Sequence, residues 1–282
     1  MIQKMKGTYD VTDAIGYYQA IEQAIRKVSR LYNVEEIRTP HFGTRELFPR
    51  TVGADSDIVS KETYDFEDRG GRINTLRPEG TAGIVRAYIE NKLYTDPRVP
   101  LKRYYIGSMF RYERPQKGRF REFRQFGAEF FASAHPATDA ELIDYALNVL
   151  RALKLKDVSV HINSLGGKES KEAYTDALRS HLKPHLDALC EDCKVRYEKN
   201  PLRILDCKKD ADKEAIKSAP RTIDHLTEAS EPLAFQVLFQ RKPDWSRRAR
   251  RRSGDLLAGK DTLTQKLLSI ESTPQRTSPS MR

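Results

Sequence analysis

One long β-hairpin is predicted at residues 104–131, YYIGSMFRYERPQKGRFREFRQFGAEFF. This prediction strongly restricts the folds that the chain can adopt. Two aromatic-rich segments alternate between apolar and polar residues on either side of a Pro-Gln-Lys-Gly turn at 115–118. A period of two indicates strands whose two faces meet different surroundings. The sequence therefore predicts a largely antiparallel sheet built around this hairpin.

The two faces of the predicted hairpin differ in chemistry. One face carries Arg111, Gln125 and Glu129 beside Gly107 and Gly127. A glycine inside a strand lets another group approach the backbone closely, and here we expect a ligand. A guanidinium, an amide and a carboxylate suit a small zwitterion joined to a phosphate group, because arginine binds phosphate through two parallel hydrogen bonds. The other face is predicted to be the core side: Tyr104, Ile106, Phe110, Tyr112, Phe120, Phe126, Ala128 and Phe130.

Ordinary cross-strand ion pairs on an exposed sheet are the alternative explanation of this charge. The segment TLRPEGTAG at 75–83 favours a ligand, because Glu79 and Thr81 stand at the start of a predicted helix whose N-terminus attracts anions. Glu79 alone is more often a solvated acid at a helix start. The hairpin turn adds three cations suited to a polyphosphate or an RNA end: Arg114, Lys117 and Arg119.

Periodicity predicts further elements around the hairpin, giving an α+β fold. We expect helices at 13–32, 81–93 and 141–153, strands at 36–39 and 158–163, a second hairpin turn at 68–71, and mostly helix over 166–229. Thr12 or Asp13 is predicted to cap the first helix. Thr138 and Glu141 match a capping box ahead of the third helix.

Bulk properties indicate a cytoplasmic protein. No apolar run approaches the ~20 residues that span a bilayer, and the N-terminal MIQKMKGTYD lacks the apolar centre of a signal peptide, so we expect no membrane partner. The three cysteines, Cys190, Cys193 and Cys207, are an odd number that does not indicate a disulfide framework. They are candidate zinc ligands with His181 or His185 as the fourth, but the spacing fits no standard site, so we expect no bound metal.

The composition changes near residue 231. Residues 231–282 hold 11 Lys/Arg and 5 Asp/Glu, so six of the ten net positive charges lie there. The segment 241–252 is rich in arginine, and the segment after it has no clear packing period. We expect a poorly ordered basic tail, with RNA binding through phosphate contacts as the alternative.

Several long segments resemble one known family. KGTYDV, EEIRTPHF, ELFPRTVG, TLRPEGTAG and FRYERPQKGRFREFRQFGAEFF closely resemble, in this order, segments of histidyl-tRNA synthetases, a family of class II aminoacyl-tRNA synthetases. The resemblance covers about residues 1–230. It implies a class II catalytic core over 1–230, with an antiparallel sheet flanked by helices and a helical insertion at about 166–229. It also implies ATP-dependent activation of histidine with Mg²⁺, transfer to tRNA(His), and a homodimer formed through the region of the first helix and EEIRTP.

The resemblance also implies roles for individual residues. Arg111 would be the catalytic arginine at the α-phosphate and the histidine carboxylate. Glu113 and Arg119 would bind ATP, and Arg114 and Lys117 would face the acceptor end of tRNA. The remaining matches form the histidine pocket: Glu79, Thr81 and Gln125 for the amino group, and Glu129 for the imidazole.

Other family segments are not found in the sequence. These are a segment reading roughly Arg-Gly-Leu-Asp-Tyr-Tyr, the third class II motif with its ATP-binding arginine, and the anticodon-binding domain. We therefore expect an incomplete catalytic core and impaired aminoacylation. A non-catalytic, histidine-sensing regulatory paralogue is the alternative, although the retained ATP-side residues Arg111, Glu113 and Arg119 favour the synthetase.

Overall fold

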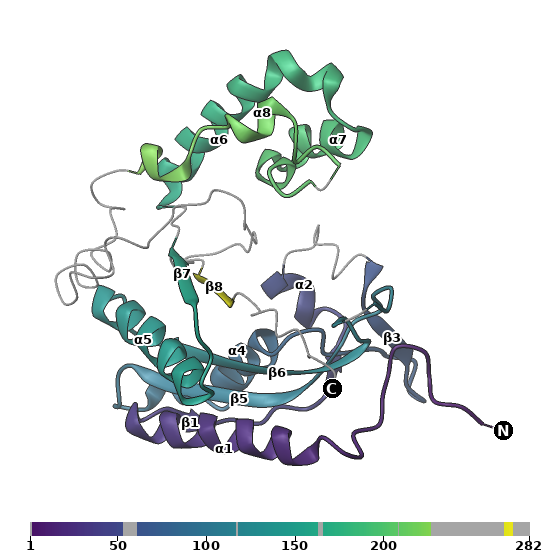
Figure 1. The fold of residues 1–282 in the computed structure, drawn as a ribbon, viewed down its shortest axis with the longest axis vertical. Coiled ribbons are helices and arrows are strands. Elements are labelled where there is room, and N and C mark those ends of the chain that lie inside the picture. The colour runs from purple at the N-terminus through teal and green to yellow at the C-terminus, as the bar shows by residue number, and fades with distance from the viewer. Residues whose placement is uncertain are drawn as a thin grey trace, which may run out of the picture. The chain divides into compact units, whose positions relative to one another are not determined.

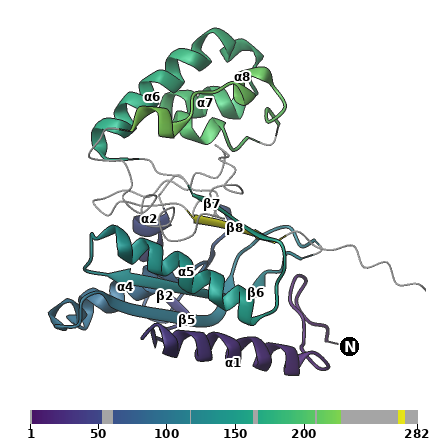
Figure 2. The same cartoon turned by 60° about the vertical axis from the view of Figure 1, so that its left-hand side comes forward.

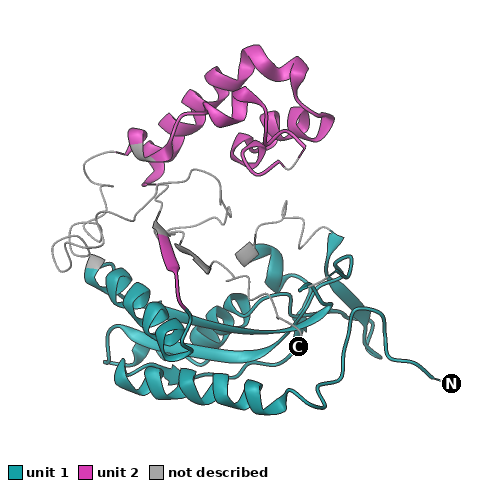
Figure 3. Ribbon diagram, viewed as in Figure 1, with its two compact units in different colours: residues 1–155, 258–260 teal, residues 156–257, 261–282 magenta. Residues whose placement is uncertain are grey.

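The computed structural model describes residues 2–52, 61–116, 118–162, 166–207, 209–226 and 268–272. The chain forms two compact units (Figure 3): unit 1 contains residues 1–155 and 258–260, and unit 2 contains residues 156–257 and 261–282. Helices and mostly antiparallel strands make up unit 1, which agrees with the predicted α+β class. The arginine-rich segment 241–252 lies outside the described residues, and so does the rest of the predicted tail except 268–272.

The predicted hairpin is confirmed as the centre of unit 1. Strands β5 (Leu101–Phe110) and β6 (Glu122–Phe131) pair antiparallel over their whole length, with Tyr105 opposite Gly127. The short strand β1 (Glu35–Glu36) adds to β5 in parallel, so the sheet order is β1-β5-β6. The strand expected at 36–39 is therefore shorter and begins one residue earlier.

Helices cover both faces of this sheet. Helices α1 (Ile15–Leu31) and α5 (Pro136–Ala152) run along the hairpin and pack on the predicted core face (Figure 1). This cluster has a fully buried centre: Ile25, Val28, Val34, Tyr104, Tyr145 and Val149. Helix α4 (Thr81–Glu90) packs on the other face through Ile84, against Tyr105 and Met109. Figure 2 shows the same helices and strands from a second side. The face expected to be open to a ligand is thus partly closed by protein.

A second antiparallel sheet leads the chain into α4. Strands β2 (Phe42–Thr44), β3 (Tyr64–Glu67) and β4 (Ile73–Leu76) pair in the order β2-β4-β3, with α2 (Leu47–Val52) after β2. The hairpin turn predicted at 68–71 is confirmed. The Asp68 carboxylate accepts the backbone N–H of Gly70 and of Arg72, and Gly71 has a φ of 75°, which glycine adopts at little cost.

Both predicted helix caps are wrong. Helix α1 begins after Ala14 with no side-chain cap, and the Thr12 hydroxyl instead donates to Asp13. Helix α5 begins at Pro136, five residues before the predicted start, and the ring nitrogen Nδ1 of His135 accepts the N–H of Ala137. Proline at the first helical position favours this earlier start because its missing N–H would have no partner there anyway.

Unit 2 is mostly helical in its described parts, as predicted for 166–229. It contains the helices α6 (Lys168–Leu182), α7 (Glu191–Lys199) and α8 (Glu214–Lys217) and the 3₁₀ turns η2 (Lys183–Ala188), η3 (Pro201–Ile204) and η4 (Thr222–His225). Strands β7 (Val158–Ile162) and β8 (Leu268–Ser272) pair antiparallel. A 3₁₀ turn, η1 (Leu93–Thr95), follows α4 in unit 1. Among the described helices of both units, none is long and apolar enough to cross a membrane.

Candidate active site

Glu79 lies at the start of α4, where the chain leaves β4. One of its carboxylate oxygens accepts the N–H of Thr81 at 2.5 Å, and the other accepts the N–H of Ala82 at 2.9 Å. These N–H groups have no partner inside the helix, so Glu79 satisfies the first turn of α4. Burial raises the pKa of Glu79 above its ordinary value, although the two backbone N–H groups favour the charged form.

Glu129 on β6 is joined to the same helix start. The Thr81 hydroxyl donates to Glu129 Oε1 at 2.6 Å. Burial and, to a smaller extent, the nearby charge of Glu79 raise the pKa of Glu129 to about 7, against the opposing effect of the Thr81 hydrogen bond. Two partly buried carboxylates thus face one small region, and a bound cation or N–H donor would stabilise their charged forms.

Gln125 lies on the same face of β6, opposite Gly107 of β5. Its Oε1 atom is buried and has no hydrogen-bond partner among the described residues. Leaving a buried amide oxygen unpaired costs about 1–3 kcal/mol, so such atoms are rare in folded proteins and call for an explanation. A donor supplied by a ligand would satisfy this oxygen.

The glycines of the hairpin admit protein side chains, not the ligand that we expected. A methyl group added at Gly107 would lie 2.3 Å from Nη2 of Arg77, and one added at Gly127 would lie 2.3 Å from the Tyr105 hydroxyl. Gly80, just before α4, is equally close to the ring of Tyr105. The close approach inferred from the glycines is therefore present, but Arg77 and Tyr105 occupy the space.

Arg77 is the residue of this region that the sequence analysis missed. It is buried, and burial lowers its pKa. Its Nε donates to the carbonyl of Ser108 at 2.8 Å and its Nη1 to the carbonyl of Thr39 at 2.9 Å. It thereby joins β5 to the loop after β1 and fixes the position of the segment that carries Glu79. In the sequence, only Gly107 pointed to a side chain at this place, since a glycine in a strand indicates that some group lies close to the backbone.

Arg111 follows β5 and lies beside this segment. Its Nε donates to the carbonyl of Pro78 at 2.9 Å, and its guanidinium carbon lies 5.1 Å from the centre of the Phe123 ring. Its positive charge acts on Glu79 and favours the charged form of that carboxylate, which opposes the effect of burial on the pKa. The structure therefore brings Arg111, Glu79, Thr81 and Glu129 into one region of unit 1.

The remaining predicted residues lie farther along the hairpin. Glu113 accepts from Arg119 at 3.5 Å and lies 3.9 Å from Arg111, while Arg119 keeps 55% of its side chain exposed. Arg114 is exposed, and Lys117 lies outside the described residues. Acceptor groups thus cluster near α4 and cations toward the turn, an arrangement that suits a ligand with an ammonium at one end and phosphates at the other.

Comparison with known proteins identifies the family. The sequence model described as histidyl-tRNA synthetase matches residues 13–235. The chain belongs to the histidyl-tRNA synthetase family. All of the site residues above lie within the matched region, whereas residues 236–282 lie beyond it.

Individual histidyl-tRNA synthetases and related structures agree with this assignment. The histidine–tRNA ligase of Anoxybacillus flavithermus is 53% identical over 226 residues, which are 80% of this chain and 53% of that protein. A crystal structure of apo S. aureus histidyl-tRNA synthetase matches with a TM-score of 0.73 and 32% identity, over 96% of this chain and 61% of that one. The chain spans about half the length of the curated relatives it matches.

A more distant structure shares the fold. It is described as an ATP phosphoribosyltransferase regulatory subunit/histidyl-tRNA synthetase from Bacillus halodurans C. The TM-score is 0.67 at 20% identity, over 96% of this chain and 73% of that one.

Proposed function

We propose that the site in unit 1 binds histidine and ATP and activates histidine for transfer to tRNA(His). The observation that carries this proposal is the buried, unpaired Oε1 of Gln125. It lies on the strand face that also carries Glu129, which the Thr81 hydroxyl joins to the start of α4. Family membership supports the same function.

The acceptor-rich end of the site is assigned to the amino acid. Glu79, Thr81 and Gln125 would receive the N–H groups of the histidine ammonium, and Glu129 would receive an imidazole N–H. The ammonium beside Glu79 and the imidazole N–H beside Glu129 would offset the cost of burying two carboxylates. These carboxylates serve as hydrogen-bond acceptors, and the chemistry requires neither of them to transfer a proton.

The arginine end is assigned to ATP. In the activation step the histidine carboxylate attacks the α-phosphorus, a new C–O–P linkage forms, and pyrophosphate leaves, so no nucleophile from the protein is needed. Arg111 would orient the two reacting groups and stabilise the charge that develops on the α-phosphate. Glu113 and Arg119 would contact the nucleotide, and Mg²⁺ enters as the ion bound to the ATP phosphates.

The proposal extends to two macromolecular contacts. The exposed Arg114 and its neighbour Lys117 would face the acceptor end of tRNA through phosphate contacts. A second copy of the chain would bind through α1, which exposes large apolar side chains.

Titration calorimetry of the full chain with histidine, and then with ATP and Mg²⁺, tests the proposal. We expect both ligands to bind, Gln125→Ala to weaken histidine binding at least tenfold, and Arg111→Ala to weaken ATP binding. Arg69→Ala, at the exposed turn between β3 and β4 and outside the set of assigned residues, is the matched control and should change neither. Histidine binding without ATP binding would instead favour the regulatory paralogue, and histidine-dependent pyrophosphate exchange would demonstrate the activation step.

A further inference from the structure

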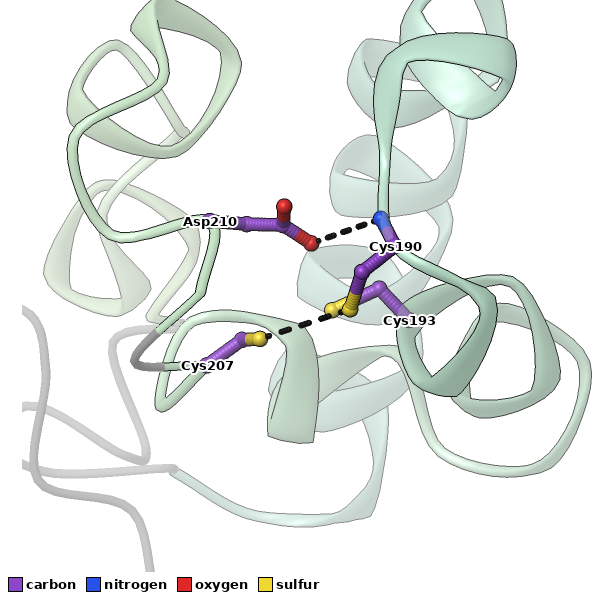
Figure 4. Close-up of side chains that lie close together, drawn as sticks. All are labelled: Cys190, Cys193, Cys207 and Asp210. Atoms are coloured by element: carbon purple, nitrogen blue, oxygen red, sulfur yellow. Dashed lines mark hydrogen bonds between the residues drawn. The ribbon is translucent and has the colours of Figure 1, made fainter.

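We propose that unit 2 contains a zinc site formed by Cys190, Cys193, Cys207 and Asp210 (Figure 4). One possible ligand atom from each residue lies within 4.8 Å of the others. Cys190 is the residue just before α7, Cys193 is in the first turn of that helix, and Cys207 and Asp210 belong to the loop after η3. Residues far apart in the sequence thus bring four possible donors to one point.

The separations suit tetrahedral zinc. Cys190 Sγ and Cys207 Sγ lie 3.7 Å apart. Two thiolates that each bind zinc at about 2.3 Å, at the tetrahedral angle, are about 3.8 Å apart. The cluster also lies in the apolar core of unit 2, with Cys193 and Cys207 buried and Cys190 partly buried. Thiolates in a water-poor core are the donor set that structural zinc sites use.

Asp210 supplies the fourth ligand in place of the histidines considered from the sequence. Only 1% of its side chain is exposed, and its Oδ2 accepts the N–H of Cys190 at 3.0 Å while Oδ1 pairs with Lys213 at 2.7 Å. Each carboxylate oxygen has a second lone pair, so these bonds orient the group and leave it able to bind a metal. His181 instead contacts the carbonyl of Ala215 at 2.9 Å through its ring nitrogen Nε2.

The sequence spacing becomes recognisable once Asp210 is included. The four residues read Cys-x₂-Cys-x₁₃-Cys-x₂-Asp. Two pairs of ligands, each separated by two residues, are the pattern of zinc sites built from two Cys-x₂-Cys loops. An aspartate in the last place hides this pattern from a search for cysteine and histidine alone.

A metal would add to the stability of this part of unit 2. Between Lys183 and His225 the described residues form short elements, of which α7, with nine residues, is the longest described there. Small regions built from short elements commonly gain stability from a metal or disulfides. The N-terminus of α7 and the Lys213 ammonium would partly offset the negative charge of the four ligands.

Cobalt titration of the full chain tests the site directly. The protein is purified under reducing conditions, stripped with a chelator and titrated with Co²⁺, which binds zinc sites and absorbs visible light. We expect one equivalent per chain, with thiolate-to-cobalt charge-transfer and tetrahedral d–d bands that disappear when Zn²⁺ is added. Absence of these bands, with the chain folded by circular dichroism, would overturn the proposal.

Variants assign the individual ligands. Cys193→Ser should weaken Co²⁺ binding at least a hundredfold. Asp210→Asn should weaken it about tenfold and preserve the charge-transfer intensity of three thiolates per cobalt. His185→Ala is the matched control and should bind as the unaltered chain does. Unchanged affinity in Asp210→Asn, or loss of binding in His185→Ala, would show that the fourth ligand is assigned wrongly.

Thiol protection gives a second readout that does not depend on a core variant remaining folded. The unaltered chain is alkylated with and without Zn²⁺, and the modified cysteines are quantified by mass spectrometry. We expect Zn²⁺ to slow modification of Cys190, Cys193 and Cys207 together, at least tenfold. Equal rates with and without the ion would contradict a shared site.

Discussion

At the scale of single residues, the side-chain oxygen of Gln125 lowers the stability of the free protein. A ligand that donates a hydrogen bond to this oxygen would restore that stability. Its buried Oε1 lacks a partner among the described residues, and the same face presents Glu129. Groups that bind a ligand are often poorly satisfied without it, so stability and affinity are expected to oppose each other at this position.

Gln125→Leu is predicted to stabilise the free chain and weaken histidine binding. The change removes the unpaired oxygen and keeps a similar volume, so the free energy of unfolding should rise by about 1 kcal/mol. Histidine affinity should fall at least tenfold, because the assigned ammonium contact is lost. Urea unfolding with and without histidine measures both effects, and Gln3→Leu, at an exposed position, is the control. A variant that is less stable yet binds histidine normally would contradict the assignment.

The raised pKa of Glu129 predicts that the stability of the folded protein depends on pH. Its pKa rises from the ordinary 4.5 to about 7 because the carboxyl group is buried. The folded protein therefore keeps a proton that the unfolded chain loses between these values, so the free energy of unfolding should fall as the pH rises from about 4.5 to 7. At about 1.4 kcal/mol per pH unit the full effect is on the order of 3 kcal/mol.

Replacing Glu129 by glutamine should remove this slope. Chemical unfolding at a series of pH values measures it, and Glu122→Gln, an exposed change on the same strand, should leave it intact. If the Glu129→Gln chain lost stability over the same pH range as steeply as the unaltered chain, another group would have to bind the proton.

Some of the residues near the proposed ligand could be predicted from the sequence, and one, Arg77, could not. Strand alternation placed Gln125 and Glu129 on one face, and the register confirms it. Arg111 could be included because it continues the same alternation past the end of β5. Arg77 could not be found, because its partners are backbone carbonyls of distant segments and these leave no pattern in the residue types.

At the scale of elements, the ring of Tyr105 lies between two glycine residues, which leave room for it because they have no side chain. Gly127 is its cross-strand partner, and Gly80 lies before α4. A methyl group at either glycine would come within 2.3 Å of the tyrosine. The packing of α4 against the hairpin thus depends on both glycines.

Gly127→Ala is predicted to destabilise unit 1 by about 1–3 kcal/mol, the usual effect of an overpacked core. The loss should be largely relieved in the Tyr105→Ala background, so thermal unfolding of the two single variants and the double variant measures the coupling. Gly16→Ala is the control, since no atom lies within 4 Å of the added methyl group and alanine favours a helix. An equal loss with and without Tyr105 would show that the tyrosine is not the cause.

Helices and strands with a strong period of apolar residues could be predicted from the sequence. The residues at which they begin and end could not. The hairpin of β5 and β6 and the turn at 68–71 follow from alternation and from paired glycines. The start of α5 differs because proline and histidine form an alternative to the expected capping box, and several local arrangements have similar free energies at a helix end.

At the scale of the whole molecule, α1 exposes apolar surface that a folded chain usually covers. Four of its large apolar residues keep large exposed fractions: Ile15 at 52%, Tyr17 at 76%, Ile21 at 44% and Leu31 at 75%. Ile25 and Val28, farther along the same helix, are buried in the core. Exposed apolar groups along one anchored helix are typical of a protein–protein contact, and a second copy of the chain is the partner proposed above.

Sedimentation velocity over a range of protein concentrations tests this contact. We expect a reversible dimer, and Tyr17→Glu should weaken it at least a hundredfold, because an interface of ordinary size cannot bury an unpaired charge without losing several kcal/mol. Val195→Glu, at an exposed apolar position on α7 of unit 2, should leave the dimer unchanged. A chain that sediments as a monomer at tens of micromolar would contradict the dimer. A dimer that survives Tyr17→Glu and dissociates with Val195→Glu would place the interface away from α1.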